Sequence, residues 1–299
     1  MQVGIDPKVD YAFKRLFGVE QNHDLLIDLL NAVLEPAEGE RITAVQLLNP
    51  FSTKESWDDK LSIVDIKARD QADRLFHIEM QMVANRFLPE RLLYYWSRLL
   101  QQQLKAGDEY GLLRPTITIC FLDDHLFDEP DWRWRFELRD AARQTRLTDL
   151  LAIHLFELPK FERPVAELAS ELERWLYFLR YGARLDPAEL PVTLQVRPIS
   201  RALEELKMLT QDELEHEQYE ARLRNALDER SKIKYHERAL SEGIQKSRAE
   251  ERTAALVDKI RLLQQILKVP PTPADDLRPR PEAELLQLYT DLERQALSR

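Results

Sequence analysis

Two acidic side chains and one amide on neighbouring segments are the residues best suited to chemistry in this sequence. Asp65 lies in the apolar context IVDIK, and Glu79 and Gln81 lie in the context IEMQM. If the two segments pair as strands, the two carboxylates meet on one face and repel each other unless a cation binds between them. A hard divalent cation that prefers oxygen ligands, Mg²⁺ or Mn²⁺, is the natural partner. Pairing of these segments would therefore create a metal site.

Both segments have the sequence pattern of β-strands, over 60–68 and 74–83, and the polar residues between them predict a hairpin. Side chains alternate across a strand, so His77 shares a face with Glu79 and Gln81. An alternative interpretation is a half-exposed strand whose polar side chains only face solvent. The spacing of the Asp and the Glu-x-Gln does not by itself decide between the two.

The surrounding elements predict an α/β core, in which helices flank the sheet that carries these residues. Asp6 and Pro7 favour a helix start, as cap and first helical residue. A helix between the third and fourth strands supplies the crossover that a parallel strand pair needs. The expected helices are 6–17, 22–35 and 90–106, and the expected strands outside the hairpin are 42–48 and 115–122.

The second half of the chain changes character. Two further strand-like segments, WRWRFELRD and LTDLLAIHLFELPKF, precede a helix at 164–182, and then 200–268 is almost entirely helix-forming. PPTP interrupts the pattern before a last helix at 281–297. We expect three parts, which are a domain over 1–200 with its core at about 5–130, a charged helical region over 201–254, and a small helical hairpin over 255–299.

Composition limits the classes of protein that fit. The net charge of −10 argues against a general nucleic-acid coat, so any DNA binding must be local. Only seven glycines are present, which argues against a turn-rich β fold. Cys120 is the single cysteine and is expected to be a buried thiol. The histidines lack zinc-site spacing. With no long apolar run and no apolar signal core, we expect a cytoplasmic protein that has no membrane partner.

The helix predicted after the hairpin carries its own signal. Arg91, Arg98 and Lys105 are seven residues apart and would form one cationic stripe. Cations beside aromatic rings suit a groove for nucleic acid. The alternative is the ordinary polar face of an amphipathic helix packed through its leucines. The residues considered for DNA contact are Arg86, Arg91, Tyr94, Tyr95 and Arg98.

Several segments together resemble the Rpn-like family of recombination-promoting nucleases and transposases, within the PD-(D/E)xK nuclease superfamily. The resemblance covers about residues 5–130, and it rests on the order and spacing of its motifs rather than on any one of them. The motifs are DYAFKRLF, LLIDLLNAVL, LLNP, HIEMQ, ERLLYYWSRLLQQQLKAGDEY and LDDHLF. The resemblance implies a restriction-endonuclease-like core, followed here by a mainly helical C-terminal region.

The resemblance also implies roles for individual residues. It makes Asp65, Glu79 and the main-chain carbonyl of Met80 the metal ligands. Gln81 stands where the superfamily usually has lysine, a replacement that the Rpn-like family also shows. A glutamine amide can orient water or a phosphate oxygen, but it cannot act as a base. A bound metal would therefore have to generate most of the nucleophile.

Four further residues are candidates for accessory roles. Asp10 and Lys14 lie one helical turn apart, on a helix that the resemblance places beside the site, and a surface ion pair is the equal alternative. Lys60 would reach phosphate or remain a solvated lysine. His77 would touch substrate or be a buried strand histidine.

These observations lead to a Mg²⁺- or Mn²⁺-dependent DNA endonuclease, which the resemblance associates with recombination or mobile elements. The rival expectation is a catalytically weak or inactive nuclease fold that binds DNA or a protein partner. The C-terminal helices are candidates for homo-oligomerisation in either case.

Overall fold

Six strands form one mixed sheet in the computed structural model, which describes residues 3–49 and 65–297. Their order across the sheet is β1-β2-β3-β4-β6-β5. The β1/β2, β2/β3 and β5/β6 pairs are antiparallel, and the β3/β4 and β4/β6 pairs are parallel. The strands are β1 (Val45–Leu47), β2 (Asp65–Asp70), β3 (Leu75–Gln81), β4 (Thr116–Leu122), β5 (Arg133–Glu137) and β6 (Leu151–Glu157).

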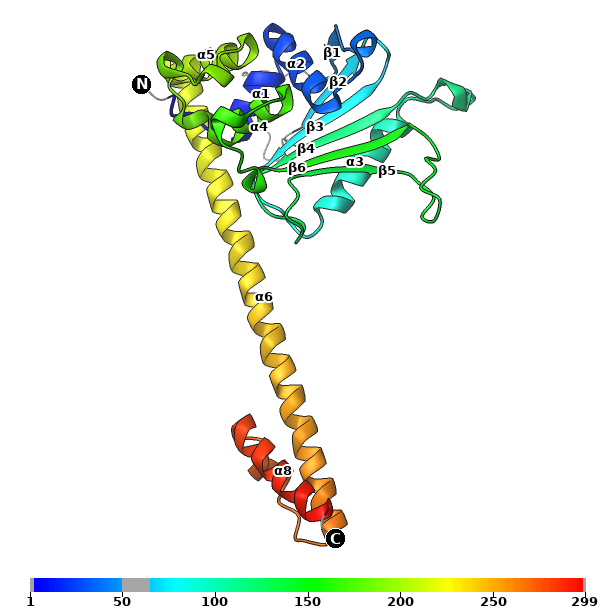
Figure 1. The fold of residues 1–299 in the computed structure, drawn as a ribbon, viewed down its shortest axis with the longest axis vertical. Coiled ribbons are helices and arrows are strands. Elements are labelled where there is room, and N and C mark those ends of the chain that lie inside the picture. The colour runs from blue at the N-terminus through cyan, green and yellow to red at the C-terminus, as the bar shows by residue number, and fades with distance from the viewer. Residues whose placement is uncertain (1–2, 50–64, 298–299) are drawn as a thin grey trace. The chain divides into compact units, whose positions relative to one another are not determined.

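Helices cover both faces of the sheet (Figure 1). One face carries α1 (Asp10–Phe17), α2 (His23–Leu34), α4 (Glu171–Tyr181) and α5 (Arg197–Gln211). The other face carries α3 (Leu88–Gln101), which provides the crossover between the parallel strands β3 and β4. The restriction-endonuclease-like core that the sequence predicts, a mixed sheet flanked by helices, is confirmed.

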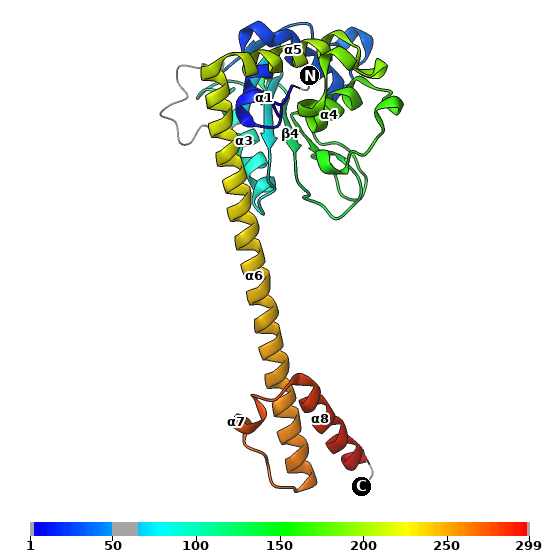
Figure 2. The same cartoon turned by 90° about the vertical axis from the view of Figure 1, so that its left-hand side faces the viewer.

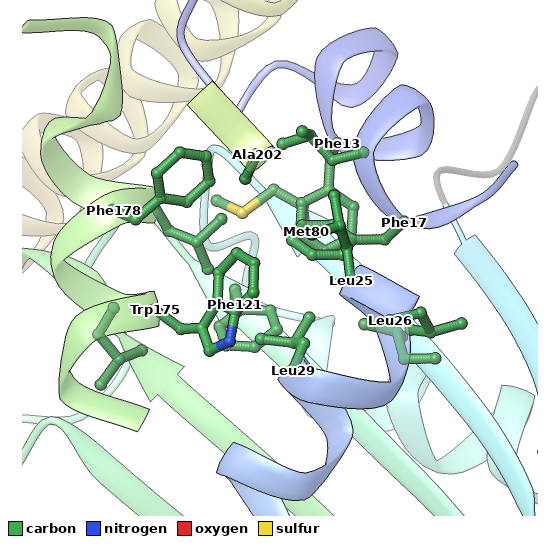
Figure 3. Packing of buried hydrophobic residues seen from close by; sticks show 14 of the residues in the cluster. Phe13, Phe17, Leu25, Leu26, Leu29, Met80, Phe121, Trp175, Phe178 and Ala202 are labelled. Atoms are coloured by element: carbon green, nitrogen blue, oxygen red, sulfur yellow. The ribbon is translucent and has the colours of Figure 1, made fainter. Parts of the chain in front are cut away.

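The larger core lies between the sheet and α1, α2, α4 and α5 (Figure 3). The Phe13 and Phe17 rings of α1 pack in a tilted arrangement at 4.9 Å between centroids, and Trp175 of α4 meets Phe17 edge-on at 5.3 Å. Met80 and Phe121 contribute from the sheet, and all five side chains are at most 3% exposed. Burial of each such side chain contributes roughly 1.5–3 kcal/mol, so this core stabilises the packing of the helices on the sheet.

A polar turn sets the register of the β2–β3 hairpin. Asp70 Oδ1 accepts hydrogen bonds from the backbone N–H groups of Ala72 and Arg74, both at 2.9 Å. Its Oδ2 pairs with the Arg74 guanidinium at 2.6 Å. Asp73 takes the left-handed conformation, with φ of 60°, which an aspartate tolerates better than most residues. Turn geometry fixes register in a hairpin, so this turn determines which residues of β2 and β3 face each other.

Several predicted boundaries are wrong by a turn or more. The first helix begins at Asp10, and Asp6 instead caps the preceding turn by accepting the Lys8 N–H at 3.0 Å. The helix expected over 90–106 ends at Gln101, because the Gln103 side chain bonds to Arg114 N and Thr116 Oγ1 and draws the chain onto β4. Lys105 therefore lies outside the helix. Only the second half of the strand expected over 60–68 falls within the described residues.

The long charged region forms a single helix, α6 (Glu213–Leu267), separated from α5 at Asp212. Backbone contacts divide the chain into two compact units, 1–230 and 231–299. In the second unit α7 (Ala274–Leu277) and α8 (Glu282–Leu297) lie against the end of α6 (Figure 2). The Gln264 amide fixes this turn by bonding to Thr272 N and Oγ1 at 3.0 and 2.9 Å. The expected three-part domain division and the expected self-association remain predictions.

No helix within the described ranges is both long and apolar enough to cross a membrane.

Candidate active site

The hairpin places Asp65 and Glu79 directly opposite each other. Their Cα positions are partners in the antiparallel β2–β3 register, as are those of Lys67 and His77. Residues paired in this way occupy the same face of a sheet, with their Cβ atoms about 4.5–5.5 Å apart. The predicted pairing of the two acidic positions is therefore present in the backbone. The side chain of Asp65 lies outside the described part of the structure.

Glu79 is the buried centre of the site. It is 1% exposed, although a carboxylate is rarely removed from water without a compensating charge. The Arg91 guanidinium donates to Glu79 Oε2 at 3.2 Å, and the Gln81 amide donates to the same oxygen at 3.0 Å. One charged donor and one neutral donor thus hold a single carboxylate oxygen.

The second oxygen of Glu79, Oε1, has a different environment. Oε1 is buried and accepts no hydrogen bond from the residues that the structure describes. His77 Nε2 lies 3.3 Å from it and is itself fully buried. A buried carboxylate oxygen without a donor, on a strand whose partner position is an aspartate, fits the oxygen-ligand chemistry of a hard divalent cation. Among the side chains described, no three His, Cys, Asp or Glu residues form a metal-binding group, and Asp65 is outside that set.

The face of β3 that carries His77 and Glu79 is buried and not solvated. His77 is 0% exposed, and Leu88 and Leu92 of α3 close over the neighbouring strands with Cys120. The α3 helix forms this second, smaller core beside the polar residues. The interpretation of these residues as a merely solvent-facing strand surface is therefore wrong for His77 and Glu79.

Some residues of α3 point toward Glu79 and others toward solvent, and the sequence pattern did not distinguish the two groups. Arg91 reaches inward to Glu79, and the Tyr95 ring packs against His77 at 5.6 Å between centroids. Tyr94 is 57% exposed, and the Arg98 guanidinium lies over its ring at 5.9 Å. The inward pair thus belongs to the polar cluster around Glu79, and the outward pair forms part of the surface.

Arg86, just before α3, is also at the surface. Its guanidinium lies 4.6 Å from the centre of the exposed Phe87 ring. Arg86 and the outward pair of α3 are therefore accessible from solvent, and Lys105, beyond the helix end, does not extend their row.

The accessory candidates are distributed around the sheet. Asp10 pairs with Arg222 of α6 at 3.8 Å. It lies with Lys14 on α1, which packs against the face opposite Glu79. The i,i+4 spacing thus did not reveal the partner of Asp10, because Arg222 is more than two hundred residues away in sequence. Lys60 lies outside the described residues.

A second polar cluster, which sequence reasoning missed, anchors the loop beside the site. Asp123 N–H donates to Gln81 O at 2.8 Å, so this loop begins next to the site. Glu157, with its side chain fully buried at the end of β6, accepts the backbone N–H of Leu126 at 2.5 Å. Lys160 Nζ donates to Glu157 Oε2 at 2.8 Å and to backbone oxygens of the loop. The sequence did contain a signal for this cluster, because an acidic residue ends an apolar strand and a lysine follows three residues later.

The comparison with known families decides the classification. The profile of the PD-(D/E)XK nuclease family transposases matches residues 7–236, which is most of the chain. The chain belongs to this family. No curated protein and no solved structure matches the sequence. Membership of the PD-(D/E)XK family agrees with the mixed sheet and with the hairpin that pairs Asp65 with Glu79. Gln81 is the departure from the motif of the family name, which has lysine at that position.

Proposed function

We propose that this PD-(D/E)XK protein is a metal-dependent DNA endonuclease. The observation that carries the proposal is the register that sets Asp65 opposite the buried Glu79. These two carboxylates and the main-chain carbonyl of Met80 would hold Mg²⁺ or Mn²⁺. A bound divalent ion would acidify water and neutralise charge on the attacked phosphate.

The chain's own polar groups would then position the reactants. Gln81 has one amide N–H on Glu79 Oε2, and its second N–H and its carbonyl oxygen are the groups that would orient water or a phosphate oxygen. Burial of Glu79 and His77 keeps bulk water out, which strengthens electrostatic interactions at the reacting centre. Because glutamine cannot take up a proton, we expect slower cleavage than a lysine at position 81 would support.

DNA would lie along the outer surface of α3. Arg86 and Arg98 offer guanidinium groups for phosphate contacts, and the exposed ring of Tyr94 offers a stacking surface. These groups provide the local positive charge that a chain of net charge −10 needs to bind a polyanion.

Plasmid cleavage tests the proposal. The wild type should nick or linearise supercoiled DNA with Mg²⁺ or Mn²⁺ and not with EDTA. Asp65→Asn and Glu79→Gln keep side-chain size and should each lower the cleavage rate at least about 100-fold, because each removes a charged ligand. Glu90→Gln is the matched control, since Glu90 is an exposed acid on the same helix as Arg91. Equal cutting by folded wild type and Glu79→Gln would refute the assignment.

A second candidate function is a non-catalytic nuclease fold that binds DNA or a protein. The observation in its favour is that Arg91 and Gln81 already satisfy Glu79 Oε2 without a metal. Calorimetric titration with Mn²⁺ separates the candidates. Heat of binding that disappears in Glu79→Gln supports the enzyme, and a folded wild type that takes up no Mn²⁺ supports the binding protein.

A further inference from the structure

Arg91 bridges the surface and the buried centre of the site. Its side chain is 33% exposed, whereas the Glu79 side chain that it contacts is 1% exposed. The contact uses Oε2, one of only two oxygens that Glu79 can offer to a cation. An arginine and a divalent ion would therefore compete for the same buried negative charge.

We propose that Arg91 is an exchangeable counter-ion, which neutralises Glu79 before metal binds and is then released to a DNA phosphate. This inference rests on the proposed endonuclease function and adds a positioning role for Arg91. It predicts that metal and DNA bind cooperatively, because the ion that displaces the guanidinium makes it available to the substrate.

The buried carboxylate of Glu79 carries a free-energy cost. An unpaired buried charge is strongly unfavourable, so Glu79 needs a cation whether or not metal is present. Among the described residues, the Arg91 guanidinium is the permanently charged group that bonds to it. Binding of a divalent ion would neutralise the same carboxylate and repel a guanidinium at close range.

The partial exposure of Arg91 lowers the free-energy cost of moving its guanidinium away from Glu79. A third of the side chain is already in contact with solvent, and rotation about its side-chain bonds can carry the guanidinium outward without moving α3. Its planar fork of N–H donors matches phosphate geometry as well as carboxylate geometry. It is also on the helix that carries Arg98 and Tyr94, so its outward position joins the surface proposed for DNA.

A fixed structural bridge predicts the opposite result. If Arg91 only kept Glu79 in place for the metal, its removal would weaken metal binding. If Arg91 competes with the metal, its removal strengthens metal binding in the absence of DNA. The sign of one measured change therefore separates the two roles.

The experiment is calorimetric titration of the full chain with Mn²⁺, without DNA. Arg91→Met keeps much of the side chain's apolar volume and removes the charge. It should bind Mn²⁺ about 10-fold more tightly than the wild type, which is ~1.4 kcal/mol. Arg91→Gln removes the charge but retains an amide NH₂ group that can donate hydrogen bonds, and it should change the affinity in the same direction. This second variant is used if Arg91→Met does not fold. Arg143→Met is the control, because Arg143 is an arginine with an 80% exposed side chain on the loop between β5 and β6, and it should match the wild type.

Duplex binding provides a second readout, with Ca²⁺ in place of Mn²⁺. Coupling between two ligands is reciprocal, so Ca²⁺ should strengthen duplex binding by the wild type about 10-fold more than by Arg91→Met, as followed by fluorescence anisotropy. Wild type that binds Mn²⁺, with Arg91 variants of equal or lower affinity, overturns the counter-ion role and leaves the endonuclease proposal standing. Wild type that takes up no Mn²⁺ overturns both.

Discussion

Replacing Glu157 by glutamine tests the cluster that anchors the loop next to the site. The side chain is fully buried, and both of its oxygens accept from donors. Leu126 N and Phe127 N donate to Oε1 at 2.5 and 3.2 Å, and Trp134 Nε1 and Lys160 Nζ donate to Oε2 at 2.9 and 2.8 Å. Every partner is a donor, so the carboxylate is the only group of this size that satisfies all four.

The magnitude follows from the donors that lose an acceptor. The glutamine amide in Glu157→Gln has one accepting oxygen in place of two. In either orientation of the amide, its NH₂ group therefore faces two of the four donors. Each buried donor left without an acceptor costs about 1–3 kcal/mol. Loss of the charge opposite the Lys160 ammonium adds to this. We expect a loss of about 3 kcal/mol in the free energy of unfolding, or roughly 6–12 °C in Tm for a unit of this size.

The pH dependence gives an independent check. Burial alone would raise the pKa of Glu157, but the backbone N–H of Leu126 and the Lys160 ammonium outweigh it and hold the pKa below its usual 4.5. A carboxyl group with a depressed folded pKa contributes stability that is present above the unfolded pKa and is lost as pH falls through the folded pKa. The difference between wild type and Glu157→Gln should therefore shrink below about pH 4.5.

The assay is urea unfolding of the full chain, followed by circular dichroism at pH 7 and at pH values down to 4. Glu162→Gln is the control, because Glu162 is exposed on the segment just after β6. Surface substitutions of this kind change stability by less than about 0.5 kcal/mol. A Glu157→Gln protein as stable as this control at pH 7 would refute the reasoning about the four donors.

Two further predictions concern buried groups on β6 and β4. Burial, with Arg135 and Arg133 nearby, lowers the pKa of His154 to about 4, so the unfolded chain protonates first and stability should fall by on the order of 3 kcal/mol as pH drops from about 6.5 to about 4. Urea unfolding of His154→Gln at several pH values checks this prediction, because the variant should lose the fall in stability between about pH 6.5 and 4. A His154 pKa near 6.5, measured by NMR in the folded protein, would contradict it. Burial, reinforced by Glu79, raises the pKa of the fully buried Cys120 thiol. Iodoacetamide should therefore modify it only after urea unfolds the chain, and rapid modification of native protein would show that the thiol is accessible.

The hairpin that pairs Asp65 with Glu79 could be predicted because its determinants are local. The alternation of apolar and polar residues in β3 and the polar turn at Asp70 both lie within a short stretch of chain. A shift of one residue would turn Ile78 and Met80 away from the larger core, so the apolar pattern fixes the register with the turn. The family motifs carry the same information.

The surroundings of Glu79 could not be predicted, because they depend on contacts between distant segments. Periodicity placed Arg91 and Tyr95 on a helix but not on its inward side. That orientation follows from packing of Leu88 and Leu92 against strands β4 and β6. In the same way, the partner of Asp10 comes from α6, far along the chain. The local sequence pattern predicts which residues share a face of a helix or strand. The residues that contact that face are determined by the tertiary fold.

The position of α3 would reconcile an acidic chain with the proposed DNA substrate, which is also negatively charged. At physiological ionic strength, exposed charges are screened beyond about 8 Å, so most of the chain's excess negative charge acts only weakly at the site. Arg86, Arg91 and Arg98 lie on or just before this one helix, whereas Glu79 is buried beneath it. Packing of α3 on the sheet thus brings a cationic surface next to a buried carboxylate. Any mutation that loosens this packing should weaken both the counter-ion of Glu79 and the surface proposed for DNA.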